Sequence, residues 1–397
     1  MRNSTVRAVN RLTKRWAEHA DPAGGGSGTV FTAAGVWPLL ALLADGSAGP
    51  ARAELAEALG IPAEDGAGAA RELLAALAGV RGLQAATGLW TAAELPLEDA
   101  WSAHLPPGAR GVLTGDEDTD RQALDAWAAD RTGRLIGRLP VPLGKDALLV
   151  LASALALGLR WLQPFDEDSG TLQRGPWAGR DATVLYRSTS LLDRVTVARG
   201  PHGAVTVLEV VGSGGVDVHL VLGEPDAAAD AVLATGIDAL TRALPTTGAS
   251  LLPDGNPGPG LALATVRAET PEPRLRIETV AFEVRAEHNL LDHAGLFGLE
   301  TARDQDHGHF PGVSPRPLAI GAAGQSALAR FHATGFEDAA VTALAACPGG
   351  AAIPRLRYRA RRAEVRFDRP FGFLAVHRTS RLVLAAGWVA EPATVGA

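Results

Sequence analysis

The feature that most constrains this chain is an unbroken apolar run near its middle. Residues 147–157 read ALLVLASALAL, with Ser153 as the one polar side chain. Such a run is typical of a strand buried on both faces in a large sheet. Apolar residues before the run recur at helical spacing, and strand-like stretches dominate after it. The pattern predicts an α+β protein with N-terminal helices and large, mostly antiparallel β-sheets.

Other stretches predict individual elements. Residues 3–20 and 120–139 have the spacing of amphipathic helices, the second ending near Pro140. Strand-like stretches flank GSGG, residues 212–215, which predicts a hairpin. The stretch PRLRIETVAFEVRAE, residues 273–287, favours a strand. We see no long linker between the helical third and the strands, so we expect a single domain.

Composition narrows the classes of function. The net charge of −7 favours solubility and argues against general nucleic-acid binding. The N-terminus lacks the apolar core of a secretion signal, and residues 146–162 are too short, and Arg160 too close, for a membrane span. The chain as written therefore predicts a cytoplasmic protein, or an extracellular one if the start site is misassigned. The excess of Ala, Gly and Arg indicates a GC-rich genome.

Usual enzyme motifs are missing from the sequence. GQSAL at Gly324 lacks the final glycine of G-x-S-x-G, and Gly144–Lys145 lacks the spacing of a phosphate loop. The histidines of HGH, residues 307–309, favour a solvated loop over a metal site. The lone Cys347 has no base beside it in the sequence, so we interpret it as a bystander thiol.

The last strands resemble the C-terminal signature of the serpins. This signature lies in VRFDRPFGFLAVHRTSRLVLAAGWVAEP, and its matching residues are Asp368, Pro370, Phe371, Phe373, Gly387 and Pro392. Further serpin-like motifs follow in order along residues 3–392: the segment from Thr29 to Gly60, ATGLWT, the helix with Trp127, Thr132, Gly133 and Ile136, the central strand with Trp161, Pro164, Phe165 and Thr171, and HFPGVS. The resemblance implies a serpin fold with an exposed reactive-centre loop, in a bacterial, actinobacterial-like member.

The resemblance places the hinge of that loop at ATGFEDAAVT, residues 333–342. Its residues are Gly335, Phe336, Glu337, Asp338, Ala339, Ala340, Val341 and Thr342. In serpins the hinge inserts into the large sheet after a protease cuts the loop, and small side chains ease that insertion. Phe336 and Asp338 depart from this pattern, and the resemblance places both on the face that becomes buried. A buried carboxylate without a partner is costly, so Asp338 should slow insertion.

Two counts give different scissile bonds. Counting from the hinge reaches Gly349–Gly350, and counting back from Pro370–Phe371 reaches Arg359–Ala360. The bonds Arg355–Leu356 and Arg357–Tyr358 lie between them and also offer a cation to a trypsin-like or subtilisin-like protease. The alternative interpretation of these arginines is a solvated edge strand whose charges block association.

Three more positions carry expected mechanical roles. Ser153 stands where serpins often have a buried Asn, Gln325 where they have His, and Trp161 in the central-strand motif. The alternative for Ser153 is a small core residue without a mechanical role.

The resemblance implies an inhibitor of serine endopeptidases that acts as a suicide substrate. The alternative is a non-inhibitory serpin whose loop is cut without trapping the protease. Either way we expect a monomer with no catalytic residues, metal or cofactor, whose partner is a trypsin-like or subtilisin-like serine protease rather than nucleic acid or membrane.

Overall fold

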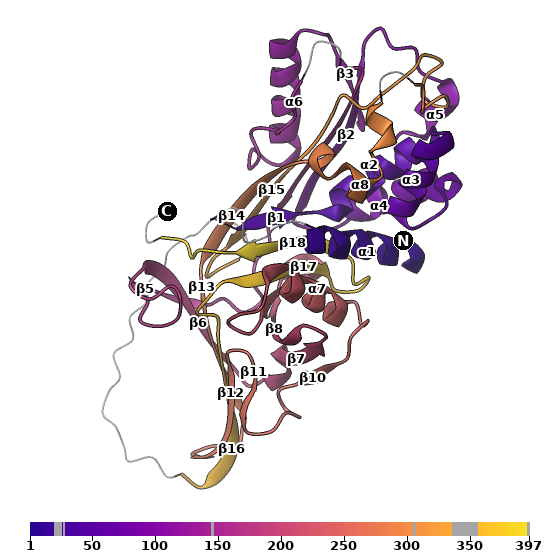
Figure 1. Ribbon diagram of the computed structural model, residues 1–397. Helices are drawn as coiled ribbons and strands as arrows, with labels where there is room; N and C mark the ends of the chain where they lie inside the picture. The colour runs from indigo at the N-terminus through magenta and orange to yellow at the C-terminus, as the bar shows by residue number, and fades with distance from the viewer. Residues whose placement is uncertain (20–25, 27, 144–146, 305–306, 336–355, 395–397) are drawn as a thin grey trace.

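The computed structural model describes residues 1–19, 26, 28–143, 147–304, 307–335 and 356–394 (Figure 1). The α-helices of this part are α1 (Asn3–His19), α2 (Ala33–Asp45), α3 (Gly49–Leu59), α4 (Gly66–Ala78), α5 (Asp99–His104), α6 (Glu117–Arg131), α7 (Ala229–Leu240) and α8 (Ala294–Phe297). Most of them precede the long strands, as the sequence pattern predicts.

The strands form three sheets, and most neighbouring strands are antiparallel. The seven-stranded sheet has the order β1 (Thr29–Phe31), β18 (Val383–Val389), β17 (Phe371–His377), β9 (Val216–Leu222), β8 (Gly203–Val211), β7 (Val195–Gly200) and β10 (Thr246–Gly248). The six-stranded sheet has the order β11 (Gly255–Gly258), β12 (Leu261–Ala268), β16 (Tyr358–Arg366), β13 (Arg274–Val280), β6 (Asp181–Thr189) and β5 (Asp166–Thr171). The five-stranded sheet has the order β14 (Phe282–Asn289), β15 (Ala322–Phe331), β4 (Leu149–Leu157), β2 (Leu83–Ala92) and β3 (Arg110–Leu113).

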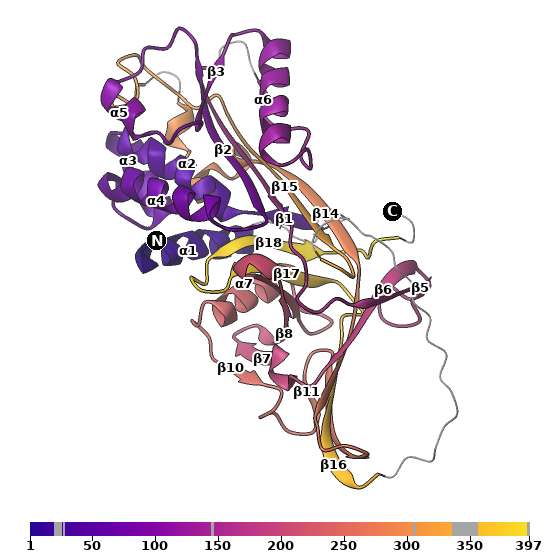
Figure 2. The same cartoon turned by 180° about the vertical axis from the view of Figure 1, so that it is seen from behind.

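The five-stranded sheet lies between two groups of helices. Figures 1 and 2 show α6 against one face and α2 with α4 near the other. Every residue of β4 is buried, because alternate side chains enter two apolar clusters. Leu151 and Leu155 belong to the main core with α2, whereas Ala152 and Ala154 pack in the smaller cluster beneath α6. This two-sided burial explains the apolar run without alternation.

Strand β16 is an inner strand of the six-stranded sheet. It pairs antiparallel with β12 from Tyr358–Ala268 to Val365–Leu261 and parallel with β13 from Arg362–Arg274 to Arg366–Glu278. From Arg362 to Val365 both sides of β16 are therefore paired, whereas Tyr358–Arg361 pair with β12 alone, so Arg359 does lie at an edge.

Two predicted elements differ in extent. Helix α6 ends at Arg131, before Pro140, because Gly133 and Arg134 have φ of 58° and 66°, which right-handed helix excludes. Residues 273–287 form two strands in different sheets, with the break at Ala281 between β13 and β14. Alternation continues through that break, so periodicity alone did not reveal it.

A buried histidine in β9 predicts a pH dependence of stability. Burial lowers the pKa of His219 to about 4, and its Nδ1 has no hydrogen-bond partner among the described residues. The unfolded chain takes up a proton below about pH 6.5, whereas the folded chain does so only near pH 4. Stability should therefore fall as the pH drops from about 6.5 to 4, by about 1.4 kcal/mol per pH unit.

Urea unfolding midpoints at pH 7, 6 and 5 measure this dependence. His219→Leu should flatten the dependence, whereas the exposed His202→Gln should retain it. Equal slopes for wild type and His219→Leu would show that His219 does not cause the loss.

Candidate functional site

The candidate site is the seam between β4 and β15. These strands pair in parallel, from Val150–Ala322 to Ala156–Leu328. A segment that followed β15 and turned back could run antiparallel to both strands. Antiparallel pairing is slightly more stable per residue than parallel pairing, so the seam is a favourable place for an additional strand.

The chain leaves β15 through a turn, His332–Gly335, that is tied to the end of β4. The amide N of His332 donates to the carbonyl O of Gly335 at 2.8 Å, and Gly335 forms an antiparallel bridge with Arg160. Trp161 donates twice to this turn, from its amide N to Thr334 O at 3.0 Å and from Nε1 to His332 O at 2.8 Å. Trp161 thus contacts the beginning of the expected hinge.

Position 335 requires glycine because the backbone of β4's end passes too close for a side chain, and not because of its backbone dihedral angles. A Cβ atom at this position would lie 2.1 Å from the carbonyl O of Leu159. Because real Cβ contacts never come so close, any side chain would separate the turn from β4. The hinge glycine of the sequence therefore fixes where the segment beyond it begins.

The expected polar pair lies in the middle of the seam. Ser153 and Gln325 are register partners across β4 and β15, and both are fully buried. The amide of Gln325 accepts from Thr32 N at 2.8 Å and donates to Thr32 O at 2.9 Å. Thr32 is the N-cap of α2, so Gln325 joins β15 to the start of this helix.

Ser153 differs from Gln325 because its Oγ has no hydrogen-bond partner in the described structure. The helix α2 comes close to it at Gly35, where a Cβ atom would lie 2.5 Å from that Oγ. Ser153 therefore contacts α2 without a hydrogen bond to it.

The opposite face of the seam is covered by the segment that follows α6. Gly324 of β15 packs against this segment, since a Cβ atom there would lie 2.8 Å from Val141 and 3.0 Å from Pro140 O. Ile136, Leu139 and Val141 are buried in the cluster beneath α6. Widening the seam would therefore require this segment to shift.

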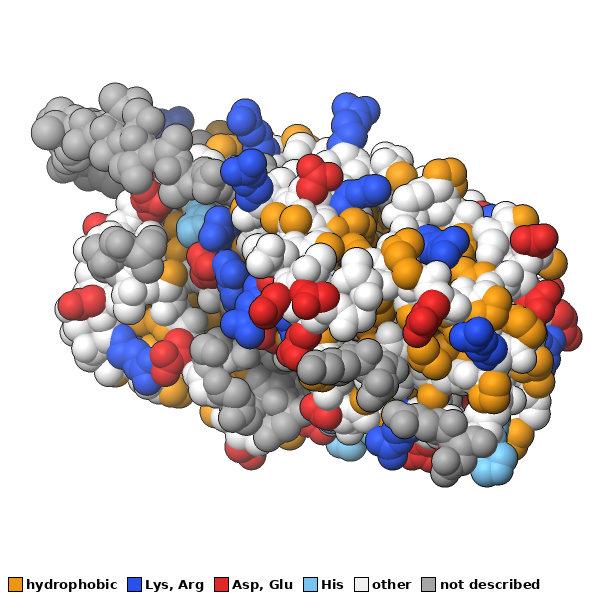
Figure 3. All heavy atoms as spheres, turned by 90° about the horizontal axis from the view of Figure 1, so that it is seen from above, with side chains coloured by type: hydrophobic (Ala, Val, Ile, Leu, Met, Phe, Trp, Pro, Cys, Tyr) orange, Lys and Arg blue, Asp and Glu red, His pale blue; other side chains and the backbone are white. Residues whose placement is uncertain are grey.

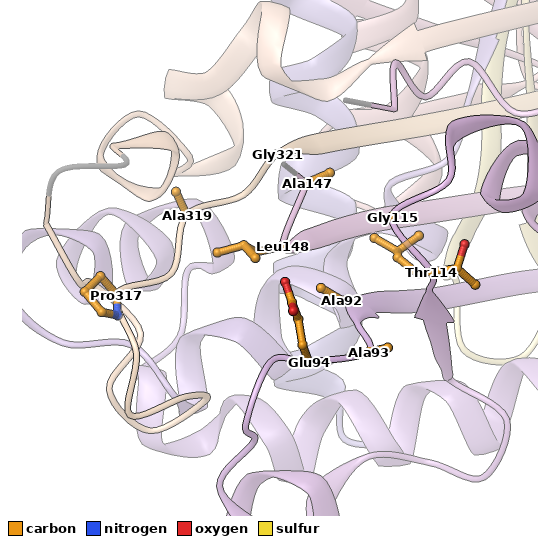
Figure 4. Close-up of a pocket in the computed structure, with 11 residues that line it drawn as sticks. Ala92, Ala93, Glu94, Thr114, Gly115, Ala147, Leu148, Pro317, Ala319 and Gly321 are labelled. Carbon is orange, nitrogen blue, oxygen red and sulfur yellow. The ribbon is translucent and has the colours of Figure 1, made fainter. Parts of the chain in front are cut away.

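A pocket of about 430 Å³ lies at the foot of the seam (Figure 4). Ala147 and Leu148, just before β4, and Ala319 and Gly321, just before β15, are among the residues that line it. The carboxylate of Glu94 points into the space between them (Figure 4). The seam thus ends in an open hollow rather than in packed core.

The expected loop residues fall largely outside the described part of the chain. This holds for Phe336 to Thr342, for Gly349, Gly350 and Arg355, and for Cys347. Leu356 and Arg357 are exposed, and Tyr358 begins β16. Arg359 and Ala360 pair with Arg267 and Val266 of β12, and Ala360 is only 1% exposed.

The position of Arg359–Ala360 disagrees with the count back from Pro370–Phe371. A protease must surround an extended chain, and a bond inside a paired strand does not allow this. The strand β16 is long enough to include the residues that the count assigns to the loop. The bonds before Tyr358 remain as candidates.

Many arginines of the basic segment have structural partners. Arg366 pairs with Glu364 at 2.5 Å and with Glu278 at 3.4 Å. Arg369 pairs with Asp368 at 3.2 Å and donates to Gly223 O at 2.7 Å. Basic and acidic side chains also lie next to each other on the face that Figure 3 shows. The local excess of arginine thus serves, in part, to hold the C-terminal strands.

A carboxylate–histidine cluster in the seven-stranded sheet is a poor metal site. Potential ligand atoms of Glu209, Asp217 and His219 lie within 4.8 Å of one another. However, Arg378 donates to both carboxylate oxygens of Asp217, at 2.6 and 2.8 Å, and Arg194 pairs with Glu209. These guanidinium groups occupy the positions that a cation needs.

Among the described helices we find none with the length and hydrophobicity that crossing a membrane requires.

The two polar residues of the seam should respond differently to substitution. Gln325→Met leaves the buried amide N of Thr32 without its acceptor and should lower the free energy of unfolding by about 1–3 kcal/mol. Ser153→Ala removes a hydroxyl that has no partner and should cost less than about 1 kcal/mol. Urea unfolding of both variants measures the difference. An equal loss would show that Ser153 has a hydrogen bond in solution.

Comparison with known proteins identifies the fold. Residues 7–178 match the model of the serpin (serine protease inhibitor) family. No curated protein matches the chain by sequence.

Several solved structures are similar over almost the whole chain. One is thyroxine-binding globulin in complex with thyroxine, with a TM-score of 0.71 and 16% identity over 98% of this chain and 99% of that chain. Serpin48 of the insect Tenebrio molitor, described as highly specific, has a TM-score of 0.71 and 18% identity over 98% of both chains. Native protease nexin-1 with heparin has a TM-score of 0.72 and 14% identity over 98% of this chain and 100% of that chain.

These similarities extend over 98% of this chain and so include all three sheets. The chain has the serpin fold, and its residues 7–178 resemble the serpin family model.

Proposed function

We propose that this protein inhibits a serine endopeptidase as a suicide substrate. The protease serine attacks a bond in the segment between β15 and β16, and the N-terminal part of that segment then inserts into the β4–β15 seam while still esterified to the enzyme. The observation that carries the proposal is the turn His332–Gly335, whose bridge to Arg160 fixes the start of the following segment beside the end of β4. The arginine-rich, lysine-poor composition supports a bacterial source.

The anchors of this turn define the register of insertion. Counting on from the Gly335–Arg160 bridge places Thr342 beside Ser153 of β4. Counting on from the His332–Gly335 hydrogen bond places the same Thr342 beside Gln325 of β15. Since Ser153 and Gln325 already face each other, the two counts agree. The hydroxyl of Thr342 would then supply a partner near the Oγ of Ser153.

The same register places small residues where the core is tight. Ala340 would lie between Leu155 and Ala327, both in the main core. Glu337 falls on the opposite face, beside Arg330, which already pairs with Glu283 at 3.0 Å. Most of the hinge therefore suits insertion.

Asp338 is the exception. In this register it lies between Leu157 and Ala329, which are 3% and 1% exposed and belong to the main core. Its carboxylate would lose water without gaining a partner from either neighbour. Because about 1.4 kcal/mol in a barrier slows a step tenfold, even part of this cost delays insertion while the ester is hydrolysed. We therefore propose a leaky inhibitor.

The depth of the seam bears on the position of the cut. In the proposed register Pro348 reaches Ala147 and Ala319, which line the pocket at the foot of the sheet. A cut at Gly349–Gly350 would hold the enzyme directly against this pocket. A cut after Arg355 or Arg357 would leave residues 350–355 or 350–357 as a linker between the inserted strand and the protease. We propose that cleavage at Gly349–Gly350 traps a protease more efficiently than cleavage at the arginines.

The alternative is a non-inhibitory protein whose segment is cut without trapping. Asp338 is the observation that favours it, since a sufficiently slow insertion always loses to hydrolysis. Thyroxine-binding globulin, by its name, is a protein of this fold that binds a small molecule. The experiments below separate the two functions.

A gel experiment tests the proposed function. The protein is incubated with a trypsin-like and with a subtilisin-like serine protease and boiled in detergent. We expect a covalent complex as a minor product and cleaved protein as the major one, with the cut between residues 349 and 357 by mass spectrometry. Cleaved protein without any complex, at every protease ratio, would establish the alternative. First cuts in α1 to α4 would show that another segment is the target.

Substitution of Asp338 tests the hinge. Asp338→Ala removes the carboxylate that would be buried, so the ratio of complex to cleaved protein should rise about tenfold or more, and the cleaved form should melt at a higher temperature. Glu337→Ala is the matched control, because in the proposed register that side chain would face outward beside Arg330, where a charged pair contributes little. A stoichiometry titration against one protease measures the ratio. No change with Asp338→Ala would mean that Asp338 finds a buried partner or never enters the sheet.

A further inference from the structure

A second cavity lies between α4, β2, α5 and α6. Its volume is about 710 Å³, within the range of small-ligand pockets. Its walls are mainly apolar, with Leu74 and Leu77 of α4, Leu83 and Ala85 of β2, Leu105 and Trp127 among the lining residues. The proposed inhibitory function makes no use of this cavity.

The cavity exists because β3 is shorter than β2. Strand β3 pairs only with Leu89–Ala92, so residues 83–88 of β2 have no strand on that side. Pro106 and Pro107 cross near this edge and line the cavity, and proline cannot continue the ladder because it lacks an amide hydrogen. Trp127 closes another side by packing against Gly88, where a Cβ atom would lie 2.7 Å from its ring.

Two arginines give the cavity a charge. Arg71 of α4 and Arg131 at the end of α6 both line it, and both are exposed. Within the described residues neither forms a salt bridge, although many other arginines of this chain do. No acidic residue lines the cavity. An apolar hollow beside two unpaired guanidinium groups is complementary to a molecule with an apolar body and one anionic end.

We propose that this cavity binds a medium- or long-chain carboxylate, with its hydrocarbon chain against Leu74, Leu83 and Trp127 and its carboxylate at Arg71 and Arg131. The hydrocarbon supplies most of the affinity, because each buried CH₂ group contributes about 0.8 kcal/mol in transfer free energy. The arginines select the anionic head, since guanidinium and carboxylate form charge-assisted hydrogen bonds.

Displacement of a fluorescent fatty acid, 11-(dansylamino)undecanoic acid, by dodecanoate tests the proposal on the full-length protein. We expect dodecanoate to compete, octanoate to compete at least tenfold more weakly, and dodecanol to bind regardless of the arginines. Arg71→Gln with Arg131→Gln should weaken dodecanoate about threefold to tenfold and leave dodecanol unchanged. Arg316→Gln, which lies outside the cavity, is the matched control.

A second variant tests the location. Ala75 lies on the exposed side of α4 and lines the cavity, so Ala75→Trp should fill the space without disturbing the core and abolish displacement. Its circular dichroism should match the wild type. Binding that survives Ala75→Trp, or that loses as much affinity for dodecanol as for dodecanoate in the arginine variants, would overturn the proposal. So would the absence of any binding to the wild type.

Discussion

The parallel pairing of β4 with β15 is the constraint on which the rest of this structure depends. It brings together a strand from the middle of the chain and one from its last fifth, with helices packed on both faces. Each strand has one antiparallel neighbour, β2 for β4 and β14 for β15, and the turn that ends at Gly335 is bridged to Arg160 beyond the end of β4. The parallel pair thus leaves the five-stranded sheet in a less favourable arrangement than antiparallel neighbours at the same place would give.

Polar groups inside this seam limit how freely it opens. Gln325 fixes β15 to the N-cap of α2, so a shift of β15 must carry or break two buried hydrogen bonds. Ser153 has no such bond, and the strand β4 can move past Gly35 without losing one. The two strands are therefore held differently at this level: Gln325 of β15 is hydrogen-bonded to the start of α2, whereas Ser153 of β4 only packs against the helix. The covering segment with Val141 adds a second restraint from the other face.

Local sequence signals anticipated much of this fold. Burial on both faces gives β4 its apolar run, and the Gly-rich turn marks the β8–β9 hairpin, so both were readable from the chain. Features that depend on partners far away in the sequence could not be predicted from the sequence. Nothing local tells that residues 274–280 and 282–289 join different sheets, or that β12 pairs with β16 and removes Arg359–Ala360 from the loop. Trp161 and Gln325 were found through a resemblance, whereas their contacts with the turn and with Thr32 needed the structure.

The inner position of β16 has a consequence for what a cut would leave behind. A break between residues 336 and 357 makes two polypeptides, the smaller of which holds β16, β17 and β18. All three are inner strands, with neighbours from the larger polypeptide on at least one side. The small chain would therefore act as a subunit of an obligate two-chain complex, invisible to any measurement of native size. Its dissociation would be the same event as unfolding.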